Sequence, residues 1–202
     1  MNISDRLDIN LRDQLNAAQK QLEHDRAGGL AALNNIFHQG VVPNPLPNGR
    51  YWGGLITSTF NPLLDNFLGG VTQLWFPWQG KTFDAATQTG DNIFTNDGLL
   101  MGRLLWPFYD GYIPDGRGRS RAFKFRSSIG SCALDPAIEV FRMNFNLEGN
   151  PKFLVRDLVD ELRQIDEDYY LGKAVLGNLS GKPYLAAYFT LRSGLNSPNS
   201  DI

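Results

Sequence analysis

The stretch Glu139-Val-Phe-Arg-Met-Asn-Phe-Asn-Leu147 decides the fold class of this chain. From Phe141 onward, apolar residues occupy every second position, and the polar residues Arg142, Asn144 and Asn146 stand between them. The apolar set consists of Phe141, Met143, Phe145 and Leu147. A period of two is typical of a strand with one apolar and one polar face. The stretch therefore predicts a half-buried strand of an antiparallel sheet.

Several other segments have the composition of short strands. Near the C-terminus, segments 169–175 and 183–191 flank a turn at 178–182 and predict a hairpin. Clusters of Gly, Asn, Asp and Pro separate the remaining strand-like segments, which are 50–58, 71–78, 91–94, 98–106 and 122–128. Together these make about eight strands. We expect a mainly β fold, in which an antiparallel sheet closes into a barrel that can hold one ligand.

Helices are expected at the N-terminus. An apolar stripe predicts a helix over 5–25; its members are Leu7, Leu11, Leu15, Ala18 and Leu22. A second, short helix would end at Gly40. The stripe would pack on the barrel or, alternatively, pair two subunits of a homodimer.

One further helix is expected before the C-terminal hairpin. Apolar residues recur there at helical spacing, namely Val155, Leu158, Val159, Leu162 and Ile165. Asp160 and Glu161 are adjacent in this segment. Neighbouring residues of a helix do not face each other, so these carboxylates are not expected to form an acid/base pair.

Prolines 43, 45 and 47 make a stiff connection that divides the chain. We expect residues 1–42 to be a helical segment that packs on the barrel, residues 43–192 to form the barrel, and residues 193–202 to be a flexible tail.

Composition excludes several classes of function. The net charge of −2 argues against nucleic-acid binding, which needs a basic excess. The single cysteine, Cys132, excludes an internal disulfide and fits a reducing compartment. Neither a signal segment nor a run of about 18 apolar residues occurs, so we expect no membrane span. A cytoplasmic protein is the expectation.

The segment Asn48-Gly-Arg-Tyr-Trp-Gly-Gly54 opens the first predicted strand. It resembles the Gly-x-Trp signature at the first strand of lipocalin-like (calycin) proteins. Tyr51 stands two residues after Gly49, and Trp52 follows one residue later. With the strand count, the resemblance extends from about Gly49 to Leu191. It implies that the aromatic residue of this signature closes the barrel floor and that the barrel binds small hydrophobic molecules. Some relatives bind haem, and a few isomerise, cyclise or dehydrate lipids and polyketides.

Neither a haem ligand nor a metal site is evident in the sequence. His24 and His38 both precede the predicted barrel, and no histidine lies within it. The histidines and Cys132 lack the spacing of zinc ligands. A Ser-His-Asp or Cys-His set cannot be assembled in the barrel either. We therefore expect no metal and no cofactor.

Candidate ligand-binding residues come from two aromatic clusters, 75–83 and 105–112, and from polar positions on predicted strands. Gly80 and Lys81 read as a turn within the first cluster. An arginine facing inward would bind a carboxylate or phosphate, whereas one facing outward would be solvated. The candidates are Trp75, Trp78, Arg103, Trp106, Phe108, Tyr112, Phe125, Arg126, Asn144 and Tyr170.

Three residues are candidates for proton transfer. Asp110, if buried among aromatics, would have a raised pKa, and Tyr109 stands beside it. Asp110 precedes Gly111, however, and could simply form a turn. Lys173 could be a buried amine or an outward strand lysine.

These observations favour binding of a small, largely apolar molecule inside the barrel, such as a lipid, an isoprenoid or a polyketide-like compound. An arginine or lysine would anchor its polar end. The alternative is a barrel enzyme, an isomerase, cyclase or dehydratase, in which Asp110, Tyr109 or Lys173 moves a proton and the aromatic walls fix the substrate conformer. An assembly protein paired through the Leu7–Leu22 stripe is the third hypothesis.

Overall fold

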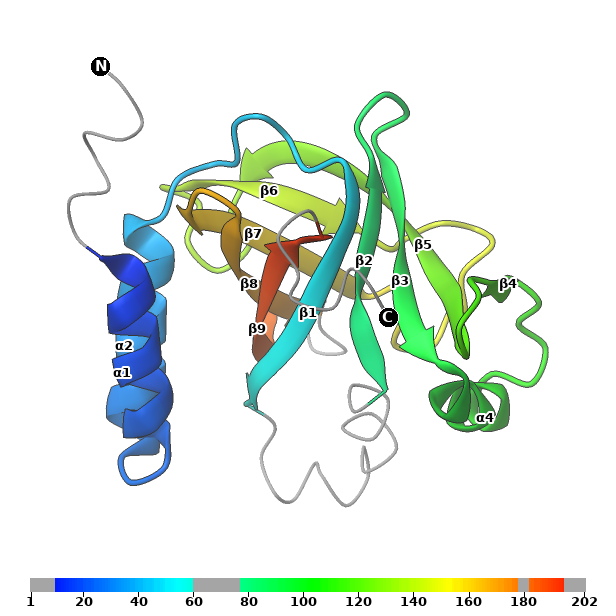
Figure 1. Cartoon of the computed structure of the whole chain (residues 1–202), viewed down its shortest axis with the longest axis horizontal. Helices are drawn as coiled ribbons and strands as arrows, with labels where there is room; N and C mark the ends of the chain where they lie inside the picture. Colours follow the sequence, from blue (N-terminus) through cyan, green and yellow to red (C-terminus); the bar gives the residue numbers. More distant parts are fainter. Residues whose placement is uncertain (1–9, 60–76, 178–181, 195–202) are drawn as a thin grey trace.

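The computed structural model describes residues 10–59, 77–177 and 182–194. Within these ranges eight strands form a closed antiparallel barrel (Figure 1). The barrel strands are β1 (Gly49–Ser58), β2 (Trp78–Asp84), β3 (Thr89–Thr95), β5 (Arg119–Ser131), β6 (Glu139–Asn144), β7 (Leu158–Asp166), β8 (Tyr169–Leu176) and β9 (Tyr184–Ser193). Their order is β3-β2-β1-β9-β8-β7-β6-β5, and pairing of β3 with β5 closes the ring. A two-residue strand, β4 (Ile113–Pro114), pairs with β5 outside this ring.

The predicted barrel is thus confirmed, and so is most of its strand pattern. In β6, Phe141 and Met143 are buried while Asn144 is exposed, as the alternation predicted. Of the segment predicted over 71–78, residues 71–76 lie outside the described residues. Gly80 and Lys81 are not a turn but the middle of β2, so that prediction was wrong.

In two segments the predicted type of secondary structure differs from the observed one. The helix expected over 155–165 is wrong, because strand β7 runs through most of that segment. The strand expected over 98–106 is also wrong, since residues Asn96–Leu105 form helix α4. The helix that precedes the later strands is therefore α4, at the end of β3 (Figure 1).

Both N-terminal helices were predicted correctly within the described residues. They are α1 (Leu11–Leu22) and α2 (Arg26–Gln39), and Gly40 ends α2. Side chains of Asn10 and Asp25 cap their N-termini by accepting hydrogen bonds from backbone N–H groups. The two helices lie side by side against the outside of the barrel (Figure 1).

The apolar stripe of α1 is buried within the chain itself. Leu11, Leu15 and Ala18 pack in one cluster with Ile165 of β7 and Leu171 of β8. Leu7 lies outside the described residues. The described part of the stripe covers the barrel, so it does not present a surface for pairing subunits.

One end of the barrel is filled by rings that we call the floor cluster, namely Tyr51, Phe83, Phe125, Phe141 and Tyr170. Tyr51 meets Phe83 and Tyr170 edge-on, at ring-centroid distances of 5.1 and 5.6 Å. The cluster lies toward the β2–β3 hairpin, because Gly49 of β1 pairs with Phe83 at the end of β2. Packing of this end leaves the remainder of the interior for a cavity. No helix in the described ranges is long and apolar enough to cross a membrane.

Candidate functional site

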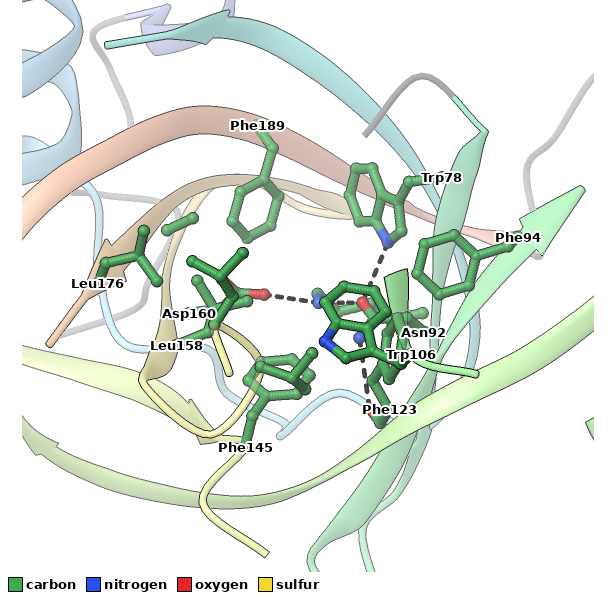
Figure 2. Close-up of a pocket in the computed structure, with 14 residues that line it drawn as sticks. Trp78, Asn92, Phe94, Trp106, Phe123, Phe145, Leu158, Asp160, Leu176 and Phe189 are labelled. Atoms are coloured by element: carbon green, nitrogen blue, oxygen red, sulfur yellow. Dashed lines mark hydrogen bonds and ion pairs between the residues drawn. The ribbon is translucent and has the colours of Figure 1, made fainter. Parts of the chain in front are cut away.

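A cavity of about 90 Å³ lies inside the barrel (Figure 2). Its walls are largely aromatic and aliphatic. Strands supply most of the lining, and the segments after α4 and β6 supply the rest. The lining residues are Trp78, Lys81, Asn92, Phe94, Trp106, Phe123, Phe145, Leu154, Val155, Leu158, Asp160, Ala174, Leu176 and Phe189. Trp78, Leu154 and Leu158 are half-buried, so the wall reaches the protein surface at these residues.

A β-bulge in β2 aims two side chains into the cavity. The pairing of β2 with β3 shifts between Trp78 and Gly80, which leaves one extra residue on β2. In a regular strand, residues 78 and 81 would point to opposite faces. Because of the bulge, both Trp78 and Lys81 line the cavity.

Gly80 makes this bulge sterically possible. Its φ of +139° is a conformation that side chains disfavour. A Cβ there would stand 2.0 Å from the backbone oxygen of Tyr51 on β1. Glycine therefore allows β1 and β2 to approach closely beside the cavity.

Four polar side chains form one connected network within the apolar walls (Figure 2). Lys81 Nζ donates hydrogen bonds to Asn92 Oδ1 and to Asp160 Oδ2, each at 2.6 Å. Trp78 Nε1 donates to the same Asn92 oxygen at 3.1 Å. The Asn92 amide in turn donates to the backbone oxygen of Phe123 at 3.3 Å. The network thus joins β2, β3, β5 and β7 across the barrel.

The Lys81–Asp160 ion pair is almost completely removed from solvent. The two residues are 1 % and 4 % exposed. Burial lowers the pKa of Lys81 and raises that of Asp160, and the attraction between the two charges opposes both shifts. Rings of Trp78, Phe125, Phe145 and Phe189 stand 5.1–5.6 Å from Nζ. Their π faces and Asn92 stabilise the ammonium form of the lysine.

Asp160 has one oxygen that the network does not use. Oδ2 accepts a hydrogen bond from Lys81 Nζ, whereas Oδ1 is buried and accepts no hydrogen bond from any described residue. An unsatisfied carboxylate oxygen is costly in an apolar environment. Oδ1 is therefore an acceptor without a partner in a residue that lines the cavity.

Trp106 covers the cavity from the segment that follows α4. Its Nε1 donates to the backbone oxygen of Phe153 at 3.2 Å, which fixes the β6–β7 loop beside it. Phe123 and Leu154, which both line the cavity, have positive φ values of 54° and 65°. Such values are strained for these side chains. At Phe123, this backbone conformation accompanies a hydrogen bond from its N–H to Tyr109 Oη, at 2.8 Å.

Of the predicted ligand-binding residues, Trp78 and Trp106 line the cavity. Phe125 and Tyr170 belong to the floor cluster beneath it. Trp75 lies outside the described residues. Tyr112 packs behind the wall, against Tyr109 and Phe123.

The remaining four candidates face solvent. Arg126 of β5 and Asn144 of β6 lie on the outer face of their strands, and Phe108 is 99 % exposed. Arg103 is exposed on α4, where its guanidinium stands 5.8 Å from the ring of Tyr112. Neither arginine lines the cavity in which it was expected to anchor a polar group.

The three predicted proton-transfer residues are not brought together. Asp110 is exposed, and the hydroxyl of Tyr109 is engaged by Phe123 and Gly111 behind the cavity wall. Lys173 is indeed buried, but on the outside of the barrel beneath α2. There it donates to Asn34 Oδ1 at 2.7 Å and stands 4.2 Å from the centre of the Phe37 ring. Burial lowers its pKa.

Lys81, Asn92 and Asp160 were missed as site residues. The sequence offers one indication for Lys81 and Asp160, because a charged residue within an apolar strand needs a buried partner. Asp160 stands between Val159 and Leu162, and Lys81 precedes Thr82 and Phe83. The sequence alone does not show that these two distant charges meet.

The chain matches no protein-family model and no curated protein. It is similar in structure to a protein from Thermomonospora curvata, known from a crystal structure. The two are 16 % identical, the match covers 87 % of this chain and 97 % of that one, and the TM-score is 0.44.

Proposed function

We propose that this protein binds a small, largely apolar molecule inside its barrel. The observation that carries the proposal is the cavity itself, whose walls are aromatic and aliphatic except for one connected polar network. Apolar walls with a few placed polar groups are the usual form of a small-molecule site. A volume of about 90 Å³ suits a compact molecule, or one end of a longer lipid-like or isoprenoid chain.

Trp78 and Trp106 make this proposal directly testable, because both contribute to the cavity wall. We would titrate the protein with cyclohexyl methyl ether, a compact and neutral probe, and follow tryptophan emission and thermal stability. Occupancy should shift the emission. It should also raise the melting temperature, because a ligand that binds only the folded state stabilises it by mass action.

A variant that fills the cavity provides the matched comparison. Ala174 lines the cavity and is 1 % exposed, so Ala174→Leu should weaken binding of the ether at least tenfold by occupying its space. Ala137 is exposed and outside the cavity, so Ala137→Leu should bind normally. Solvent extraction of protein purified from its own host would identify a natural ligand. Failure of the wild-type protein to bind either this ether or the corresponding alcohol, cyclohexanol, would overturn the proposal.

A barrel enzyme is the second candidate, and one observation favours it. Asp160 is a buried carboxylate with a raised pKa and an unused oxygen in an apolar cavity, which is the environment of a general acid or base. Asp160, rather than Asp110 or Tyr109, would then transfer the proton in an isomerisation, cyclisation or dehydration. For such an enzyme, Asp160→Asn should abolish turnover of a bound substrate while its affinity persists.

We also propose that the protein functions in the cytoplasm. Cys132 is a free and buried thiol, as a protein of the reducing cytoplasm would have it.

A further inference from the structure

We propose that the ligand of the cavity is a neutral alcohol or phenol, whose hydroxyl donates a hydrogen bond to Oδ1 of Asp160. This inference rests on the proposed function and names the chemical class of the molecule. It replaces the expected cationic anchor with an anionic acceptor.

The unused oxygen requires a donor. Oδ1 of Asp160 is buried, and Asp160 lines the cavity, but no described residue donates to this atom. The other carboxylate oxygen is already held by Lys81 at 2.6 Å. A ligand that carries an O–H group can satisfy Oδ1, whereas an ether or a hydrocarbon of the same shape cannot.

The net charge of the site selects a neutral molecule. Lys81 and Asp160 neutralise each other, and both are buried. A ligand carboxylate would add a second negative charge beside Asp160, and a ligand ammonium would add a second positive charge beside Lys81. Either charge would have to enter the cavity without a counter-ion, which is costly. A hydroxyl supplies the donor without the charge.

The rest of the cavity recognises an apolar body. Phe94, Phe145 and Phe189 present rings to the space, and Leu158 and Leu176 present aliphatic groups. These side chains offer burial but no hydrogen bond. The network residues Asn92 and Trp78 are already bonded to each other at 3.1 Å, so they do not need a ligand partner. A single hydroxyl on an apolar ring or chain is therefore the complementary ligand.

The experiment compares four probes of similar shape, namely cyclohexanol, cyclohexyl methyl ether, cyclohexylamine and cyclohexanecarboxylate. Dissociation constants would be measured by tryptophan emission on the wild-type protein. We expect cyclohexanol to bind about tenfold tighter than the ether or better, the size of effect of a hydrogen bond to a charged group. Both charged probes should bind more weakly than the alcohol.

A double variant tests the residue itself. Lys81→Met with Asp160→Leu removes the ion pair as a unit and makes the wall apolar. It should retain binding of the ether and lose the preference for the alcohol. Asp110→Asn, which changes an exposed carboxylate outside the cavity, should keep that preference.

Each outcome has a distinct meaning. Equal binding of alcohol and ether to the wild-type protein would overturn this inference but leave apolar-ligand binding intact. Preference for the amine or the carboxylate would overturn it in favour of a charged ligand. Failure of all four probes would remove the proposed function as well. If the double variant does not fold, the wild-type comparison still decides.

Discussion

Asp160 and Glu161 show how two adjacent residues of one strand serve two sides of a barrel wall. Asp160 points inward to Lys81, at 2.6 Å. Glu161 points outward and is fully buried beneath the neighbouring segments, where it accepts hydrogen bonds from Cys132 Sγ at 3.0 Å and from the backbone N–H of Ala133 at 2.7 Å. Successive side chains of a strand lie on opposite faces, so each acid has its own partners.

The inner pair predicts a strong dependence of each charge on the other. Lys81→Met or Asp160→Leu alone would leave one buried charge without a counter-ion, and we expect each to lower the free energy of unfolding by about 3–5 kcal/mol. The double variant should be more stable than either single variant, since the uncompensated charge is gone. Asn92 keeps Trp78 as a partner in every case. Urea denaturation of the three variants measures these differences.

A surface pair provides the control for this cycle. Arg12 and Asp166 are about 41 % and 44 % exposed and 3.5 Å apart. Arg12→Met should change the free energy of unfolding by no more than about 1 kcal/mol, because solvent screens an exposed pair. Additive effects of Lys81→Met and Asp160→Leu would contradict the coupling that we infer.

At the scale of elements, the β2 bulge predicts an asymmetric response to alanine at two glycines. Gly80→Ala would place a Cβ against the backbone of β1 at a disfavoured φ, so we expect a loss of at least about 2 kcal/mol in unfolding free energy. The bulge aims Trp78 and Lys81, and tryptophan emission should therefore change as well. Gly149→Ala meets nothing within 4 Å and should be nearly neutral. Equal stability of the two variants by denaturant unfolding would refute this role of Gly80.

The helices that cover the barrel predict a second effect at this scale. Leu15 of α1 is fully buried and packs in one cluster with Ile165 and Leu171 of the barrel. Leu15→Ala should cost about 2–5 kcal/mol of unfolding free energy through the cavity it leaves. Asn16→Ala, on the exposed side of the same helix, should cost little. A native mass that stays unchanged in Leu15→Asp would further separate this packing within the chain from subunit pairing.

Sequence patterns predicted strand β6, which has one solvent-exposed face, and failed for β7 and α4. Segment 139–147 alternates because its outer face meets solvent. In β7 both faces are buried, inward toward the cavity and outward beneath α1 and α2, so no alternation is visible and the apolar residues fit a helical period by chance. The apolar run 98–106 is equally compatible with either type of element, and it forms α4.

The same limit applies to the site. Two residues of the predicted aromatic clusters, Trp78 and Trp106, line the cavity, because large apolar side chains gather wherever a barrel encloses space. The polar residues of the cavity were not among the candidates, since Lys81 and Asp160 are 79 positions apart and meet only through closure of the ring. Contacts of this kind depend on strand register, which a single sequence does not specify at a bulge.

At the scale of the whole molecule, the barrel has two apolar regions separated by the sheet. One lies inside, from the floor cluster to the cavity, and the other lies between the sheet and helices α1 and α2. Each region contains a buried lysine, Lys81 within the barrel and Lys173 beneath α2. Tyrosines also belong to both regions, with Tyr170 in the floor cluster and Tyr188 beneath the helices. Titration of the tyrosines therefore reports on the integrity of both regions at once.

The chain contains 7 tyrosines, and burial raises the pKa of five of them. For Tyr112 the pKa rises to about 12 from an ordinary value of 10.0, and for Tyr170 and Tyr188 it rises further. A raised pKa means that the folded state holds the proton more tightly than the unfolded state. The stability that these tyrosines contribute is thus fully present below pH 10 and is lost as the pH rises through their folded values. Lys81 and Lys173 have lowered pKa values, so their contribution to the free energy of unfolding rises with pH up to 10.5 and opposes that of the tyrosines.

We therefore choose tyrosinate absorbance rather than overall stability as the measurement. Ionisation in the native protein should lag behind that in guanidinium-unfolded protein, and the late fraction should appear together with loss of the β-sheet circular dichroism signal. Tyr188→Phe should remove part of this late fraction. Superimposable titration curves for the native and unfolded protein would contradict the prediction, because they would show that burial in the two apolar regions does not raise the pKa of the tyrosines.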